Sequence, residues 1–151
     1  MGQAANINPR IIEALYGEGL LLSDEVRAAF QLSDMDSADP EDARRIALSC
    51  EALRTTTRMM HAIAWLLNHR AFCRGEISEF QLRRHGRLST DFPPADPARM
   101  DLLSGEIRCL IESTERFYER LSRIDAAWRA SESRCPPAIQ SMRERLIKAV
   151  G

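Results

Sequence analysis

The chain has 151 residues, of which 44% are apolar and 28% are charged, and this average globular composition excludes a disordered protein. Its longest apolar run, residues 62–67, is far shorter than the roughly 18 to 20 residues that cross a bilayer, so membrane insertion is not expected. The formal charge of -1 removes the strong attraction on which nucleic-acid binders usually depend.

The amino-terminal residues and the cysteines indicate a cytoplasmic protein. The opening residues MGQAANINPR lack the basic start and the apolar core of a signal peptide. The four cysteines, Cys50, Cys73, Cys109 and Cys135, include no Cys-x-x-Cys pair, so free thiols are expected rather than a zinc or redox site. We expect a single domain over residues 1–151, with a core at 9–131 and a C-terminal extension at 132–151.

A first helix is predicted over residues 9–32. Asn8 can cap it, and Pro9 suits the first helical position because its missing N–H costs nothing there. The apolar stripe recurs every three or four residues through Ile12, Leu15, Gly19, Leu22, Val26 and Ala29. Gly17 and Gly19 each weaken a helix by about 1 kcal/mol relative to alanine, which favours a bend or a close helix contact there.

A second helix is predicted over residues 40–74, ending near Gly75. Its regular stripe, which we expect to face the core, is Ile46, Cys50, Leu53, Thr57, Met60, Ala64, Leu67 and Ala71. A second apolar face carries Met59, Ala62, Trp65, Leu66, Phe72 and Cys73. A helix that is apolar nearly all round is covered on both sides.

The remaining elements are also helical. Ser78 and Gln81 form a capping box for a short helix at 78–85, followed by a proline-broken loop. Asp96 and Pro97 open a third long helix, predicted over 97–131, whose stripe is Met100, Leu103, Ile107, Leu110, Thr114, Phe117, Leu121, Ile124 and Trp128. The spacing of Ile139, Met142, Leu146 and Val150 predicts a short final helix. The fold class is therefore all-α, an elongated antiparallel three-helix bundle with short additional helices.

No catalytic, cofactor-binding or metal-binding set is apparent in the sequence. His69 and Cys73 share a helix face but supply only two ligands, and neither a nucleophile elbow nor a glycine-rich loop presents a reactive group. We therefore expect neither an enzyme nor a cofactor. Arg54 and Arg58 stand four residues apart and repel each other slightly, which is typical of arginines that bind an acidic partner. The alternatives are a solvated face or pairing with the acidic first helix. DNA binding stays a distant alternative.

The sequence also carries a family resemblance. The stretch TTTRMMHAIAWLLNHRAFCRGEIS at 55–78, the segment Leu110-Ile111-Glu112-Ser113 and the pattern Leu121-x-x-Ile124-Asp125 resemble the α-proteobacterial family named for the regulator of CtrA degradation. With weaker similarity at 15–22, the resemblance spans roughly residues 10–128. It implies a homodimeric helical adaptor that brings substrates to a ClpX-type unfoldase and its ClpP protease during the cell cycle. The alternative is a structural or regulatory helical dimer of unrelated role.

Self-association is predicted through the second apolar face of the second helix. The proposed interaction residues are Met59, Trp65, Leu66 and Phe72, with Arg54 and Arg58 nearby. Left in water, this face would form a larger apolar patch than soluble monomers usually expose. The competing hypothesis is that the helix at 78–85 or the final helix covers the same face within one chain.

Overall fold

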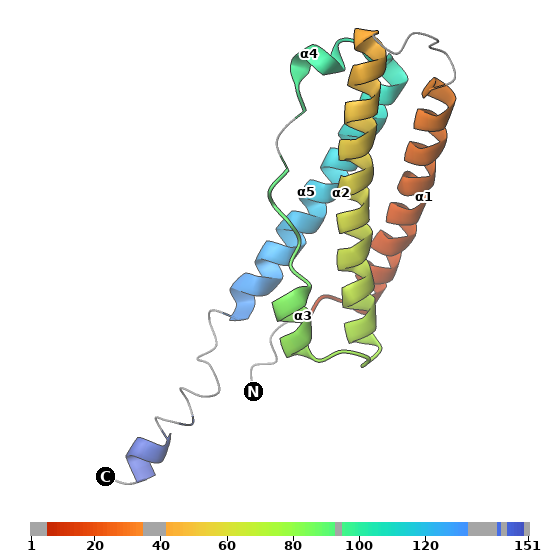
Figure 1. Cartoon of the computed structure of the whole chain (residues 1–151). Helices are drawn as coiled ribbons and strands as arrows, with labels where there is room; N and C mark the ends of the chain where they lie inside the picture. Colours follow the sequence, from red (N-terminus) through yellow and green to blue (C-terminus); the bar gives the residue numbers. More distant parts are fainter. Residues whose placement is uncertain (1–5, 35–41, 93–94, 133–141, 143–144, 150–151) are drawn as a thin grey trace.

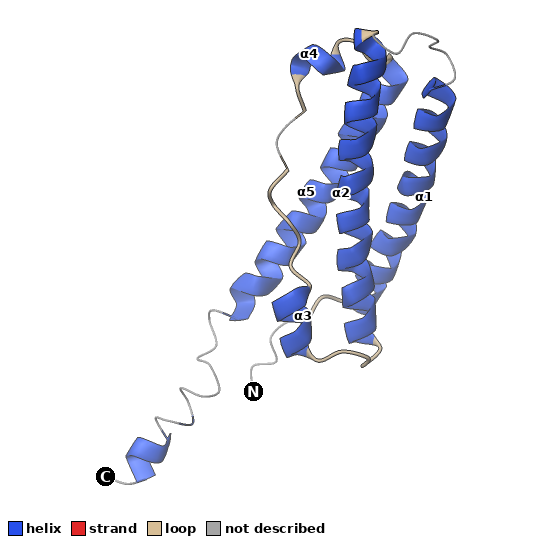
Figure 2. Ribbon diagram, in the orientation of Figure 1, coloured by secondary structure: helices blue, strands red, loops and turns tan. Residues whose placement is uncertain are grey.

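The computed structural model describes residues 6–34, 42–92, 95–132, 142 and 145–149. This part of the chain is helical, with no strand in it (Figure 2). The helices are α1 (Pro9–Asp34), α2 (Ala43–Cys73), α3 (Glu79–His85), α4 (Pro97–Met100) and α5 (Gly105–Glu132). The all-α prediction is confirmed. None of these described helices is long and apolar enough to span a membrane.

Local capping sets most helix boundaries where the sequence predicts them. Asn8 accepts a hydrogen bond from the Arg10 amide, at 2.9 Å, and starts α1. At the end of α2, Gly75 adopts a φ of 75°, and the Glu76 amide donates to the Ala71 carbonyl at 2.9 Å. This is a Schellman cap, which needs the left-handed conformation that glycine adopts without strain.

The capping box of α3 forms as predicted. The Gln81 amide donates to Ser78 Oγ at 3.2 Å, and the Ser78 amide donates to Gln81 Oε1 at 2.8 Å.

The third long helix is not continuous from Pro97. The short helix α4 ends at Met100, a turn follows, and α5 begins at Gly105. The Ile107 amide donates to Ser104 Oγ at 3.3 Å, so Ser104 caps a new helix at the point where the sequence pattern predicts an unbroken one. Leu103 is nevertheless buried, which explains why the apolar spacing runs through the break.

Each long helix contacts the other two, as Figure 1 shows. The helices α1 and α2 run antiparallel, whereas α2 and α5 run parallel. Two hydrogen bonds fix this direction: Arg58 on α2 bonds to Thr114 on α5, and Trp65, further along α2, bonds to Asp125, further along α5. The expected antiparallel arrangement is therefore wrong for this pair, because the segment at 74–104 carries the chain back to its starting end before α5 begins.

The predicted apolar stripes of α1 and α5 face the interior. Ile12, Leu15 and Val26 are buried on α1, and Leu103, Phe117, Leu121 and Trp128 are buried in or just before α5. A Cβ on Gly19 would stand 3.0 Å from Ile63 Cδ1 and 3.2 Å from Phe117 Cζ, so the close contact expected there is confirmed. Nothing approaches Gly17 in this way.

The prediction of which stripe of α2 faces the core is wrong. Leu53 is 71% exposed and Met60 is 67% exposed, and Ile46 and Leu67 are exposed as well. The buried face is instead formed by Ala47, Glu51, Thr55, Arg58, Met59, Ala62, Trp65, Leu66 and His69. This face is the less regular one because it mixes apolar and polar residues. Within it, Arg58 and Trp65 donate hydrogen bonds to Thr114 and Asp125 on α5.

Candidate interaction surface

The predicted self-association face lies inside the chain. Met59, Trp65 and Leu66 belong to the hydrophobic core with residues of α1 and α5, and Trp65 is only 2% exposed. Phe72 is half-buried. Trp65 and Leu66 therefore present no surface to a second molecule, because α1 and α5 cover the side of α2 that the sequence pattern left without a partner. Met59 is buried as well and reaches only the wall of a groove between α1 and α2.

The two predicted arginines are part of a polar layer inside the chain. Arg58 is buried, and its Nη1 donates to Thr114 Oγ1 at 3.0 Å while its Nη2 lies 3.4 Å from Glu115 Oε1. Burial lowers the pKa of Arg58, and the Glu115 carboxylate opposes that shift. Arg54 Nη1 lies 3.7 Å from an oxygen of the buried Glu51. The partner of Arg58 is thus on α5, not on the acidic first helix.

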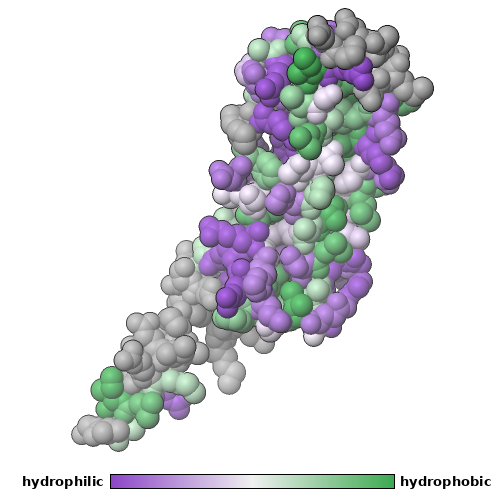
Figure 3. Space-filling view, viewed as in Figure 1, coloured by the Kyte–Doolittle hydropathy of each residue, from purple (hydrophilic) through white to green (hydrophobic). Residues whose placement is uncertain are grey.

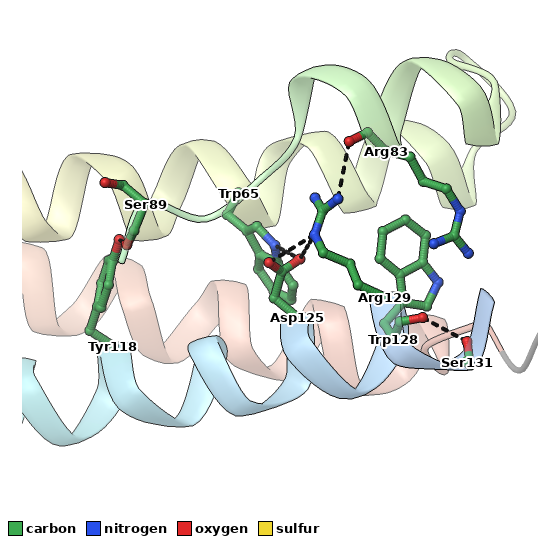
Figure 4. Close-up of polar contacts among 8 residues, drawn as sticks. All are labelled: Trp65, Arg83, Ser89, Tyr118, Asp125, Trp128, Arg129 and Ser131. Atoms are coloured by element: carbon green, nitrogen blue, oxygen red, sulfur yellow. Dashed lines mark hydrogen bonds and ion pairs between the residues drawn. The ribbon is translucent and has the colours of Figure 1, made fainter. Parts of the chain in front are cut away.

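A second polar network joins α2, α3 and α5 around Trp65 (Figure 4). Trp65 Nε1 donates to Asp125 Oδ1 at 3.0 Å, and Arg129 Nε donates to both oxygens of the same carboxylate. Arg129 Nη1 also donates to the Arg83 carbonyl, and the Arg83 guanidinium stacks 4.0 Å from the centre of the Trp128 ring. These contacts fasten α3 to the end of α5.

His69 and Cys73, which share a face of α2 in the sequence, lie in different surroundings. His69 is buried between two tryptophans, with ring centroids 4.1 Å from Trp65 and 5.1 Å from Trp128. Burial lowers the pKa of His69 to about 4, so its ring is neutral at pH 7. Cys73 is exposed. Among the residues that the structure describes, no group of three His, Cys, Asp or Glu side chains could hold a metal ion.

The surface feature that sequence reasoning missed is an apolar groove between α1 and α2. It has a volume of about 600 Å³, within the range of sites that bind partners or ligands. Figure 3 shows apolar side chains gathered along this side of the molecule. The groove is lined by Ser23, Asp24, Val26, Arg27, Phe30 and Gln31 of α1, and by Thr56, Met59, Met60, Ile63, Ala64 and Leu67 of α2.

Part of the exposed stripe of α2, at Met60, Ala64 and Leu67, forms one edge of the groove. Large apolar residues recur every seven positions, at Ile46, Leu53, Met60 and Leu67. The alternate positions of the same stripe hold the small residues Cys50, Thr57, Ala64 and Ala71. A heptad repeat of this kind is the pattern by which one helix packs against another, and small side chains permit close approach of the axes. This heptad repeat is visible in the sequence, but there it predicts a helix face directed toward the core.

The fold and the groove together define an all-helical protein with an apolar groove between two of its long helices. The chain belongs to the family described as "Protein of unknown function (DUF1465)", whose model matches residues 3–150. No curated protein matches the chain. No solved structure matches it either.

Proposed function

We propose that this protein is a non-enzymatic interaction adaptor in regulated proteolysis, which delivers substrates to a ClpX-ClpP type protease in the cytoplasm during the cell cycle. The observation that carries the interaction role is the exposed α1–α2 groove, because folded proteins rarely leave an apolar heptad edge in water without a partner. The proteolytic role is supported by the resemblance of residues 55–78 and of the third long helix to the regulator of CtrA degradation family.

The geometry of the groove favours recognition of a helix. The groove between two antiparallel helices can bind a third helix, whose apolar anchor residues stand three, four and seven positions apart. Met60 and Leu67 stand seven residues apart on one wall, and Val26 and Phe30 stand four apart on the other. A substrate or partner would thus offer an amphipathic helix.

The test is capture of partners from the source organism with a ClpX variant that traps substrates without hydrolysing ATP. The wild-type chain should be captured together with ClpX and substrate proteins. Met60→Glu should reduce the captured substrates at least tenfold, because it places a charge in the groove while changing only an exposed side chain. Ala126→Glu, on the exposed side of α5, is the matched control and should leave capture unchanged. Failure of the wild-type chain to associate with ClpX would contradict the adaptor role.

A structural or regulatory helical dimer is the second candidate, favoured by the heptad edge of α2. Two copies could pair about a two-fold axis with Leu53 and Met60 of each α2 in contact. Sedimentation equilibrium should then show a wild-type dimer that Leu53→Glu converts to a folded monomer. A dimer that ClpX does not capture would favour this second function. The adaptor proposal instead expects a dimer that ClpX does capture.

A further inference from the structure

A second large cavity lies between α5 and the segment at 74–104, and it shares no lining residue with the α1–α2 groove. Its volume is about 610 Å³, within the range of sites that hold small molecules. The lining includes Arg58 from α2, Phe92 from the segment at 74–104, and Tyr118 and Glu119 from α5. Three parts of the chain that are distant in the sequence therefore form this cavity.

Arg58 supplies a buried positive charge to the cavity. Its side chain is 5% exposed, and its described hydrogen bonds, to Thr114 and Glu115, use two of its five N–H groups. The contact with Glu115 measures 3.4 Å, longer than the roughly 2.7 to 2.9 Å of a strong charge-assisted hydrogen bond. Burial lowers the pKa of Arg58, and the Glu115 carboxylate offsets only part of that shift. A carboxylate that accepted a hydrogen bond from Arg58 would therefore compensate a charge that the chain compensates incompletely.

The negative charge of the cavity comes from α5. Glu115 and Glu119 both line it and stand four residues apart, about 6 Å along the helix axis. Glu115 is paired with Arg58, whereas Glu119 is exposed and forms no ion pair with any residue in the described part of the chain. The Glu119 carboxylate can therefore accept hydrogen bonds from an ammonium group in the cavity.

These opposite charges determine which class of molecule fits. A simple anion would be attracted by Arg58 and repelled by the two carboxylates, and a simple cation would be repelled by the guanidinium. A molecule that carries both a carboxylate and an ammonium group can pair each charge with its opposite. In an α-amino acid the two groups are attached to the same carbon atom. With one hydrogen bond at each end, such a molecule matches a separation of about 6 Å along α5.

The cavity also has an apolar wall that is already fixed in place. The rings of Phe92 and Tyr118 pack edge to face, with centroids 5.2 Å apart and an interplanar angle of 83°. Phe92 makes a second edge contact with the His61 ring, at 5.4 Å. The Tyr118 hydroxyl donates to the Ser89 carbonyl (Figure 4). Because both rings are held, an apolar side chain can pack against them at a low cost in conformational entropy.

We propose that this cavity binds a small zwitterion of the class of apolar α-amino acids. The carboxylate of the ligand accepts hydrogen bonds from Arg58, its ammonium group donates to Glu119, and its side chain packs against Phe92 and Tyr118. The bound molecule would contact α2, α5 and the segment at 74–104 together, so it should stabilise the folded chain. This proposal does not depend on the adaptor function, which rests on the α1–α2 groove.

The test uses the full-length chain and L-phenylalanine, by isothermal titration calorimetry at neutral pH and low salt. We expect saturable binding with a dissociation constant of about 1 mM or lower. Phenethylamine lacks the carboxylate and hydrocinnamate lacks the ammonium group, so each should bind at least about tenfold more weakly. An excess of L-phenylalanine should raise the temperature of thermal unfolding, and the same concentration of either analogue should raise it less.

Two variants test where the ligand binds without changing a core residue. Glu119→Gln removes an exposed carboxylate and should weaken L-phenylalanine binding by about tenfold. Ser122→Trp places a large ring in the cavity and should weaken binding at least about tenfold by excluding the ligand. Glu112→Gln is the matched control, because Glu112 is exposed on α5 but does not line the cavity, and it should leave the affinity unchanged. Circular dichroism of every variant confirms that the helical fold is retained.

Each outcome of this assay decides the proposal. Saturable binding of L-phenylalanine that both cavity variants weaken would support it. No binding of L-phenylalanine, or equal binding of phenethylamine or hydrocinnamate, would overturn the zwitterion assignment. Wild-type affinity in Glu119→Gln and Ser122→Trp would show that the ligand binds elsewhere on the chain.

Discussion

Trp65 shows how one residue can be assigned the wrong role when only its own helix is considered. A large apolar ring on one face of a helix is as typical of a dimer interface as it is of a hydrophobic core. In the structure the ring packs on His69, and its indole N–H donates to the buried Asp125 carboxylate on α5. Asp125 is held in turn by Arg129. The tryptophan is therefore an internal contact between two helices, and it joins residues that are 60 positions apart in the sequence.

We expect substitutions of Trp65 to act on stability and not on self-association. Trp65→Phe should cost about 1 to 3 kcal/mol, because it removes a hydrogen bond to a buried carboxylate and some packing. Trp65→Glu should unfold the chain, since it buries a second carboxylate beside Asp125. Chemical denaturation followed by circular dichroism measures both. A folded, monomeric Trp65→Glu variant would restore the dimer-face assignment.

His69 should make stability depend on pH. Its pKa in the folded chain is lowered to about 4 from the ordinary value of 6.5, so the unfolded chain binds the proton more readily between these values. The stability that the neutral His69 ring contributes to the folded chain is fully present above pH 6.5. It is lost as the pH falls from 6.5 to about 4. The free energy of unfolding should decrease by about 2 kcal/mol between pH 7 and pH 5. His69→Phe should flatten this part of the curve, and an unchanged slope would show that other groups cause it.

At the scale of one element, α2 carries two stripes that compete for the core. The regular heptad stripe is exposed, and the stripe that contains Glu51, Thr55, Arg58 and His69 is buried. Burial of these polar groups costs free energy unless partners compensate it, and α5 supplies such partners to Arg58. The choice between the stripes therefore depends on the surface of another helix, which the periodicity of α2 does not contain.

A pair of leucines on α2 tests this assignment. Leu66→Ala should destabilise the chain by about 2 to 5 kcal/mol, because Leu66 is fully buried and its loss leaves a cavity. Leu53→Ala, the same chemical change at an exposed position, should alter the stability of the folded monomer by no more than about 0.5 kcal/mol. Urea titrations of the two variants at low protein concentration make the comparison. Equal losses would mean that the α2 faces are assigned incorrectly.

At the scale of the whole molecule, the segment at 74–104 decides the topology. It contains α3 and α4, and it returns the chain along the bundle so that α5 runs parallel to α2 (Figure 1). Tyr118 on α5 donates to the Ser89 carbonyl of this segment (Figure 4), and burial raises the pKa of Tyr118 to about 12. Leu88 and Phe92 of the same segment pack against the main core. The returning segment is thus part of the fold and leaves the α1–α2 side of the bundle open.

The sequence by itself determined most of the helices, because caps and apolar spacing act over a few residues, although it did not predict the break between α4 and α5. Asn8, Ser78 and Asp96 cap helices where they were predicted to, and the buried stripes of α1 and α5 follow from the order of their apolar residues. Only the tertiary structure decided which face of α2 is buried, which direction α5 runs, and hence where the groove lies. These features depend on contacts between residues that are distant in the sequence. Arg58 and Thr114 are 56 positions apart, and Gly19 and Phe117 are 98 positions apart, so no local sequence pattern predicts these contacts.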